Sequence, residues 1–300
     1  MSLPLERAIS QWLDTTPPPF TERTTVRDYR LTLTRCAASI GCNQDVRSVP
    51  GEQWYATLLA LWGTKSPSTW NRNRAAVRAF LQYLRDAGEA DTELPALCKA
   101  RKVTIDRTKA VDEDEIERLW AAELRLRERT LWRLLYDTSS RAEAILSLDV
   151  PDVDLKRNRA RTVIKGGDTN WIYFDNPSAK LLREYIGLRT AGPLFLTDGM
   201  PRNWRTRAPE DREPGGRRYR LSYNRAERIL KETTGGWTLH RIRHSRLSHL
   251  AGDGIPTPML MAISGHTSPT TLQRRYAIPS GAAVARLFEQ MRKKNGSSDD

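Results

Sequence analysis

The stretch from Leu239 to Tyr276 constrains the fold of this chain most, because all four histidines of the protein lie inside it. His240 and Arg243 are three residues apart, so a helix would place both side chains on one face. Tyr276 ends the stretch, directly after two arginines. The fold therefore has to present one hydroxyl nucleophile, several proton carriers and fixed cations in this region. Such a set suits attack on a phosphodiester better than attack on a peptide or a sugar.

The motifs of this stretch resemble those of the tyrosine recombinases, the phage integrase family. They are the boxes H-R-I-R-H-S, S-G-H-T-S and R-R-Y, in this order near the C-terminus. Each box alone is weak, since H-x-x-R occurs by chance in many helices, but the three together at this spacing are specific. The resemblance implies that Tyr276 is the nucleophile and that His240 is the general base. It also implies that Arg243 and His266 stabilise the phosphate.

The resemblance requires an arginine and a lysine upstream, and the sequence offers one candidate for each. Arg141, in T-S-S-R-A-E, matches the first arginine box, with Ser140 in place of the customary glycine. Alternating β-rich runs around residues 166–168 predict a hairpin with a third strand before it. Lys165 stands at its turn and matches the lysine that acts as the family's general acid. The alternative interpretations are an exposed arginine at a helix N-terminus and a solvated turn lysine.

The chemistry that the resemblance implies needs no cofactor. Cleavage would give a 3′-phosphotyrosine and a free 5′-hydroxyl, and the enzyme–DNA ester would retain the bond energy for religation without ATP or a metal. The sequence shows no Walker motif and no acidic metal cluster, in agreement with this expectation. We expect the remaining histidines, His244 and His249, to be structural residues.

The charge of the chain indicates a polyanionic partner. Its formal net charge is +13 and its pI is about 10.0. Nucleic acid is the commonest partner of such a chain, because each cation on a phosphate releases condensed counterions. The alternative is a protein that is simply basic. Three cysteines without a C-x-x-C pair argue against a disulfide framework and structural zinc. Since neither a membrane span nor a signal peptide is visible, we expect a cytoplasmic, nucleoid-associated protein without membrane contact.

The length predicts two domains. We expect a helical core-binding domain at 1–98, a basic linker at 99–111, and a catalytic domain at 112–300 with a tail helix at about 281–293. The expected fold class is mainly α with a small antiparallel β-sheet, an α+β arrangement whose two domains form a clamp on DNA. The candidate DNA-contacting residues are basic residues of the third helix and of the linker, namely Arg72, Arg74, Arg78, Lys102, Arg107 and Lys109. A solvated helix face and a solvated tether are the alternatives.

The segment from Pro201 to Arg220 consists almost entirely of arginine, proline, glycine and acidic residues. It is too polar to pack and long for a loop without elements of its own, so we expect a mobile basic loop that orders on DNA.

The function that the resemblance implies is site-specific recombination of double-stranded DNA. The protein would be a monomer in solution and would form a tetrameric synapse on two recombination sites. Two alternatives remain. A type IB topoisomerase would use the same nucleophile to relax supercoils as a monomer. A catalytically inactive protein of the same fold would only bind specific DNA.

Overall fold

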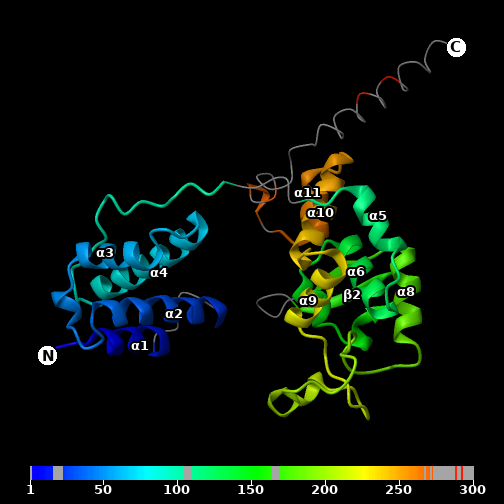
Figure 1. The fold of residues 1–300 in the computed structure, drawn as a ribbon, viewed down its shortest axis with the longest axis horizontal. Coiled ribbons are helices and arrows are strands. Elements are labelled where there is room, and N and C mark those ends of the chain that lie inside the picture. The colour runs from blue at the N-terminus through cyan, green and yellow to red at the C-terminus, as the bar shows by residue number, and fades with distance from the viewer. Residues whose placement is uncertain are drawn as a thin grey trace. The chain divides into compact units, whose positions relative to one another are not determined.

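The computed structural model divides the chain into two compact units, Met1–Thr104 and Ile105–Asp300 (Figure 1). Each unit has a hydrophobic core of its own. The boundary falls within the segment predicted as a linker. The residues that the structure describes are 2–15, 23–104, 110–163, 169–266, 268–270, 272, 288 and 292.

The N-terminal unit is helical in its described part. Its helices are α1 (Leu5–Thr15), α2 (Arg23–Ile40), α3 (Gly51–Trp62) and α4 (Pro67–Asp86), with a 3-10 turn at Val46–Ser48. Helix α4 begins where the sequence favours a helix start, because the Ser66 hydroxyl accepts from the Thr69 amide and proline occupies the first turn. Trp12 of α1 packs on Phe80 of α4, with ring centroids 5.6 Å apart. The helices thus share one aromatic core.

The second unit is built on two helices that cross its core. Helix α6 packs against α8 and α10 and contributes the fully buried Trp132, while α10 contributes Ile242. The helices of this unit are α5 (Glu113–Ala121), α6 (Leu126–Thr138), α7 (Ala142–Leu146), α8 (Asn176–Ile186), α9 (Tyr223–Thr234), α10 (Leu239–Gly252) and α11 (Thr257–Ser264).

The sheet of the second unit has three antiparallel strands in the order β1-β2-β3. The strands are β1 (Val153–Asp154), β2 (Arg159–Val163) and β3 (Thr169–Tyr173). Strands β2 and β3 pair from Arg159 with Tyr173 to Val163 with Thr169. The predicted fold class, mainly α with a small antiparallel sheet, is confirmed, and so is the hairpin with a preceding third strand.

The segment from Pro201 to Arg220 has structure of its own, so the expectation that it lacks such structure is wrong. It contains 3-10 turns at Trp204–Thr206 and Pro209–Asp211. A bridge pairs Arg212 with Tyr219, and a second bridge ties Arg220 back to Leu196. The reason is that its polar side chains bond one another and the neighbouring carbonyls instead of requiring an apolar core.

Two further observations concern the described part of the chain. None of its helices is both long enough and apolar enough to cross a membrane. Within the same residues, no group of three or more His, Cys, Asp or Glu side chains is arranged to hold a metal ion.

Candidate active site

Arg243 is the central buried cation of the site. It lies in α10 and is only 4% exposed. Its guanidinium donates to the backbone carbonyl of Ser139 and, at 2.9 Å, to the backbone carbonyl of Ser264. The first carbonyl lies two residues before Arg141, and the second lies two residues before His266. Arg243 therefore joins the three motif regions that the sequence places far apart.

Arg141 lies beside the glycine of the S-G-H motif. It is the exposed N-cap residue of α7. Its Nη1 lies 3.9 Å from the point where a Cβ on Gly265 would stand. Gly265 caps α11 with a φ of 65°, a conformation that favours glycine. The two arginines of the predicted site thus converge on the turn that carries His266.

The turn before Arg141 corrects one detail of the sequence analysis. The left-handed residue, which caps α6, is Ser139, with a φ of 48° and a ψ of 23°. The glycine-like conformation therefore belongs to Ser139 and not to Ser140. Ser139 is fully buried, and its hydroxyl has no hydrogen-bond partner. The Ser140 amide donates to the Thr138 hydroxyl at 3.2 Å, which helps to fix the turn.

His266 is oriented through its Nδ1 atom. This nitrogen lies 2.6 Å from Oγ of Ser264 and 3.4 Å from Nη2 of Arg243. Because a guanidinium can only donate, these contacts assign Nδ1 as the acceptor. The ring proton then resides on Nε2, which is the donor suited to a phosphate oxygen.

Ser264 is a site residue that the sequence analysis missed. It is 3% exposed, and its hydroxyl has two acceptors within reach, Nδ1 of His266 at 2.6 Å and the Leu260 carbonyl at 2.6 Å. Its own carbonyl accepts from Arg243. The signal in the sequence was a hydroxyl residue two positions before the histidine of the S-G-H motif.

His240 lies in the first turn of α10, three residues before Arg243. Thr238 caps the N-terminus of the helix, and its hydroxyl accepts from the Arg241 amide at 3.2 Å. The His240 side chain is exposed. Helix α10 thus carries one exposed imidazole and one buried guanidinium with the spacing that places them on one face.

His249 makes the contacts of a structural residue. Its Nε2 lies 2.8 Å from the Val111 carbonyl, and its Nδ1 lies 2.8 Å from the Tyr136 hydroxyl. Since a carbonyl only accepts, Nε2 carries the proton and the Tyr136 hydroxyl donates to Nδ1. Burial lowers the pKa of His249, so it stays neutral. His244 is buried as well, 6% exposed, one turn before Ser248.

Several predicted residues, and most of the tail helix predicted at 281–293, lie outside the described residues. The residues are Lys165, Tyr276, Arg107 and Lys109.

The predicted DNA-contacting residues of the N-terminal unit differ in how they are held. Arg72, Arg78 and Lys102 are exposed. Arg74 is half-buried, and its Nε donates to the Cys98 carbonyl at 2.5 Å. Arg74 therefore holds the chain that follows α4, whereas the exposed cations remain available to a partner.

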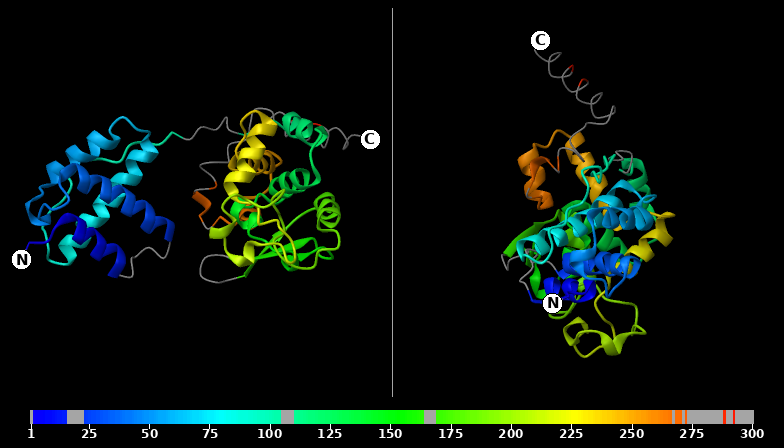
Figure 2. Two further views of the ribbon diagram at one scale, coloured as in Figure 1. Left: turned by 60° about the horizontal axis from the view of Figure 1, so that its bottom comes forward. Right: turned by 90° about the vertical axis from the view of Figure 1, so that its left-hand side faces the viewer.

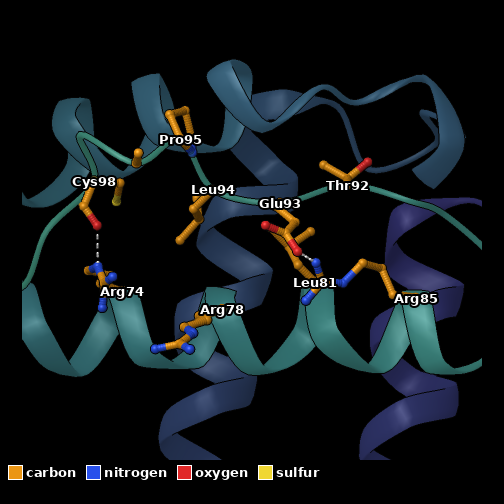
Figure 3. A pocket seen from close by; sticks show the side chains of 10 residues that line it. Arg74, Arg78, Leu81, Arg85, Thr92, Glu93, Leu94, Pro95 and Cys98 are labelled. Atoms are coloured by element: carbon orange, nitrogen blue, oxygen red, sulfur yellow. Dashed lines mark hydrogen bonds and ion pairs between the residues drawn. The ribbon is translucent and has the colours of Figure 1, made fainter.

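A pocket of about 300 Å³ lies between α4 and residues 92–98 (Figure 3). Arg74 bonds this segment at one end, and Arg85 forms an ion pair with Glu93 at the other. Arg78 also lines the pocket. The charged groups of the pocket thus fasten the segment to α4, a role in the fold of the N-terminal unit.

Comparison with known proteins identifies the family. The family model described as "Phage integrase family" matches residues 109–280, more than half of the chain. This chain belongs to the phage integrase family. The match includes all six residues predicted for catalysis.

Relatives of this family member are recombinases. It is 28% identical to tyrosine recombinase XerC of Corynebacterium glutamicum over 261 residues, which cover 83% of this chain and 80% of the relative. It is 27% identical to tyrosine recombinase XerA of Saccharolobus solfataricus over 246 residues, which cover 77% and 75%.

Solved structures share the fold. A lambda integrase tetramer bound to a Holliday junction superposes with a TM-score of 0.69 at 14% identity, covering 92% of this chain and 78% of that one. A XerA recombinase structure superposes with a TM-score of 0.51 at 20% identity, covering 96% and 99%. The integrase-family chain is therefore a tyrosine recombinase, an enzyme of site-specific recombination that cleaves and rejoins DNA. These relatives do not favour the topoisomerase or the inactive DNA-binding alternative.

Proposed function

We propose that Tyr276 attacks a DNA phosphodiester held by Arg141, Arg243 and His266, and that the product is a 3′-phosphotyrosine. The observation that carries this proposal is the pair of hydrogen bonds from Arg243 to the carbonyls of Ser139 and Ser264. They tie the first arginine box to the histidine turn.

The electrostatics of the site suit this reaction. Attack adds negative charge to the non-bridging oxygens of the phosphate, and two guanidiniums offer fixed donors to them. Arg243 is nearly fully buried, so its charge acts with little screening by water. The Nε2–H of His266 adds a further donor.

Proton transfers complete the proposed mechanism. The Tyr276 phenol loses its proton as it attacks, and the exposed His240 at the start of α10 takes that proton as general base. Lys165, at the hairpin turn, protonates the leaving 5′-oxygen. Religation reverses both transfers and uses the energy kept in the phosphotyrosine bond.

We propose the same assembly that one structural relative shows, a tetramer on a four-way junction. Four protomers would exchange strands between two specific sites on double-stranded DNA, starting from monomers in solution. Exposed cations of the N-terminal unit, Arg72, Arg78 and Lys102, would contact the DNA backbone. The similarity to Xer recombinases also supports action on the nucleoid in the cytoplasm.

The deciding experiment uses nicked suicide DNA, on which the covalent complex accumulates. The wild-type chain is expected to form an adduct, and Tyr276→Phe is expected to bind the DNA without forming one. Tyr173→Phe is the matched control, since Tyr173 is exposed on β3. An adduct of undiminished yield in Tyr276→Phe would refute the assignment. Exchange between two defined sites, as against relaxation of any supercoiled plasmid, separates recombination from topoisomerase activity.

A further inference from the structure

The arginine loop, residues 199–220, extends from the second unit on the side away from α5 and α11 (Figures 1 and 2). It joins the buried Leu196 to the start of α9 at Tyr223. It thus lies on a different side of the unit from α11, the helix that ends two residues before His266.

The base of the arginine loop is fixed by Arg220. The Nη1 of Arg220 donates to the carbonyls at and just beyond the end of α7, at 3.2 Å to Leu146, 2.7 Å to Ser147 and 3.0 Å to Leu148. Its other nitrogens bond Asp149 and Asp211, each at 2.7 Å. A cation at these carbonyls also complements the helix dipole. The loop is therefore held in a defined conformation before any partner arrives.

The charges of the arginine loop do not balance internally. It contains seven arginines and three acidic residues. Two of the acids are engaged inside the loop, Asp211 with Arg220 at 2.7 Å and Glu213 with Nε of Arg218 at 2.9 Å. This pairing leaves an excess of arginine at the surface. The exposed arginines outside these two pairs are Arg202, Arg205, Arg212 and Arg217.

The side chains around these arginines fit a nucleic-acid backbone better than a protein surface. The Arg205 guanidinium lies over the Trp204 ring, 4.9 Å from its centroid, which limits its freedom. The Arg212 Nε donates to the Gly216 carbonyl at 2.9 Å. Met200 is the large exposed hydrophobic side chain of the loop, so the loop offers several guanidiniums and little exposed apolar surface.

We propose that the arginine loop binds the phosphate backbone of duplex DNA that flanks the cleaved segment. Guanidiniums present paired donors in a geometry that matches phosphate oxygens, and several of them on one fixed loop would track a backbone. The proposal rests on the proposed function only in taking DNA as the substrate. It adds a second contact region, distinct from the catalytic residues.

The test measures DNA affinity against salt for the full chain with Arg202→Ala, Arg205→Ala and Arg217→Ala combined. Two duplexes are compared, a short one limited to the core site and a long one with flanks. On the long duplex we expect roughly tenfold weaker binding and a salt slope reduced by about one per lost phosphate contact. On the short duplex we expect no change. The control removes three exposed arginines elsewhere, with Arg118→Ala, Arg157→Ala and Arg183→Ala.

The outcomes separate the two proposals. An unchanged salt slope on the long duplex would overturn the role of the loop, even if the wild type forms its covalent adduct. Loss of recombination with an unchanged slope would show that the loop contacts protein, and would also overturn it. Failure of the wild type to form any adduct on suicide DNA would instead count against the catalytic proposal. The double variant Arg202→Ala with Arg217→Ala retains the contact of Arg205 with Trp204 and that of Arg212 with Gly216. It therefore repeats the test with less change to the conformation of the loop.

Discussion

Oγ of Ser264 lies 2.6 Å from Nδ1 of His266, while the carbonyl of the same serine accepts a hydrogen bond from Arg243. One buried residue therefore positions two of the proposed phosphate ligands. Its hydroxyl lies within hydrogen-bond distance of the imidazole and helps to orient it. Its carbonyl depends only on the backbone, so a side-chain substitution isolates the effect on His266.

Ser264→Ala is expected to slow cleavage about fivefold, because a hydrogen bond of about 1 kcal/mol that orients the imidazole is lost. Single-turnover cleavage of suicide DNA across pH 6 to 9 measures the effect. Since the imidazole loses a partner that orients it, the pH profile should change together with the rate, and Ser264→Thr should restore both. Ser147→Ala, at an exposed serine, is the control. A lower melting temperature with an unaltered pH profile would reduce Ser264 to a structural residue.

Lys165→Ala is expected to slow cleavage by about 100-fold or more, as loss of a general acid does. A substrate with a 5′-thio leaving group needs little protonation, so it should be cleaved by the variant at nearly the wild-type rate. Lys156→Ala removes an exposed lysine of the same sheet region and serves as control. A variant that the thio substrate fails to rescue would exclude Lys165 as the acid.

Ser139→Gly is expected to change the free energy of unfolding by less than about 1 kcal/mol. Glycine relieves the left-handed backbone and the unbonded buried hydroxyl, but it increases the entropy of the unfolded chain. Ser139→Val should destabilise by about 2 kcal/mol or more, because a β-branched residue strongly disfavours a positive φ. Chemical denaturation checks both values. A larger destabilisation by Ser140→Val than by Ser139→Val would contradict the conclusion that Ser139 is the residue whose conformation constrains the turn.

The carboxyl pair of Asp137 and Asp175 predicts a pH dependence of stability. Burial, followed by the hydrogen bond with Asp175, raises the pKa of Asp137 from 3.8 to about 6. Burial also acts to raise the pKa of Asp175, but hydrogen bonds from Asp137, Ser178 and Arg133 outweigh it and lower that pKa. Of the two carboxyl groups, Asp137 is therefore the one that binds a proton at the higher pH, and the Ser178 hydroxyl donates to it at 2.5 Å.

Because the pKa of Asp137 is raised in the folded chain, its contribution to stability decreases as the pH rises. Asp137 contributes its full stabilisation below about pH 4 and loses it as the pH rises through about 6. Denaturation at intervals between pH 4 and 7 should show this loss, and Asp137→Asn should flatten the curve in that range. Asp152→Asn changes a carboxyl closer to the surface and should leave the pH dependence of stability unchanged. An identical pH dependence in wild type and Asp137→Asn would contradict the assignment.

The sequence predicted those parts of the site that depend on local spacing. The three-residue interval of His240 and Arg243 required only a helix, and the hairpin followed from alternation around glycines. It did not predict the position of the left-handed residue, because serine at two adjacent positions leaves the backbone dihedral open. The sequence did not predict the structure within the arginine loop either, for a different reason. The Arg220–Asp149 pair joins residues 71 apart, and only the fold brings them together.

Val111 is a mechanical link between the start of the second unit and its central helix. Its amide donates to the Ser245 hydroxyl at 2.8 Å, and its carbonyl accepts from His249 at 2.8 Å. Both partners belong to α10, the helix of His240 and Arg243. The first residues of the second unit are therefore fastened to the helix that carries His240 and Arg243, so the position of that helix depends on backbone groups more than 130 residues earlier in the chain.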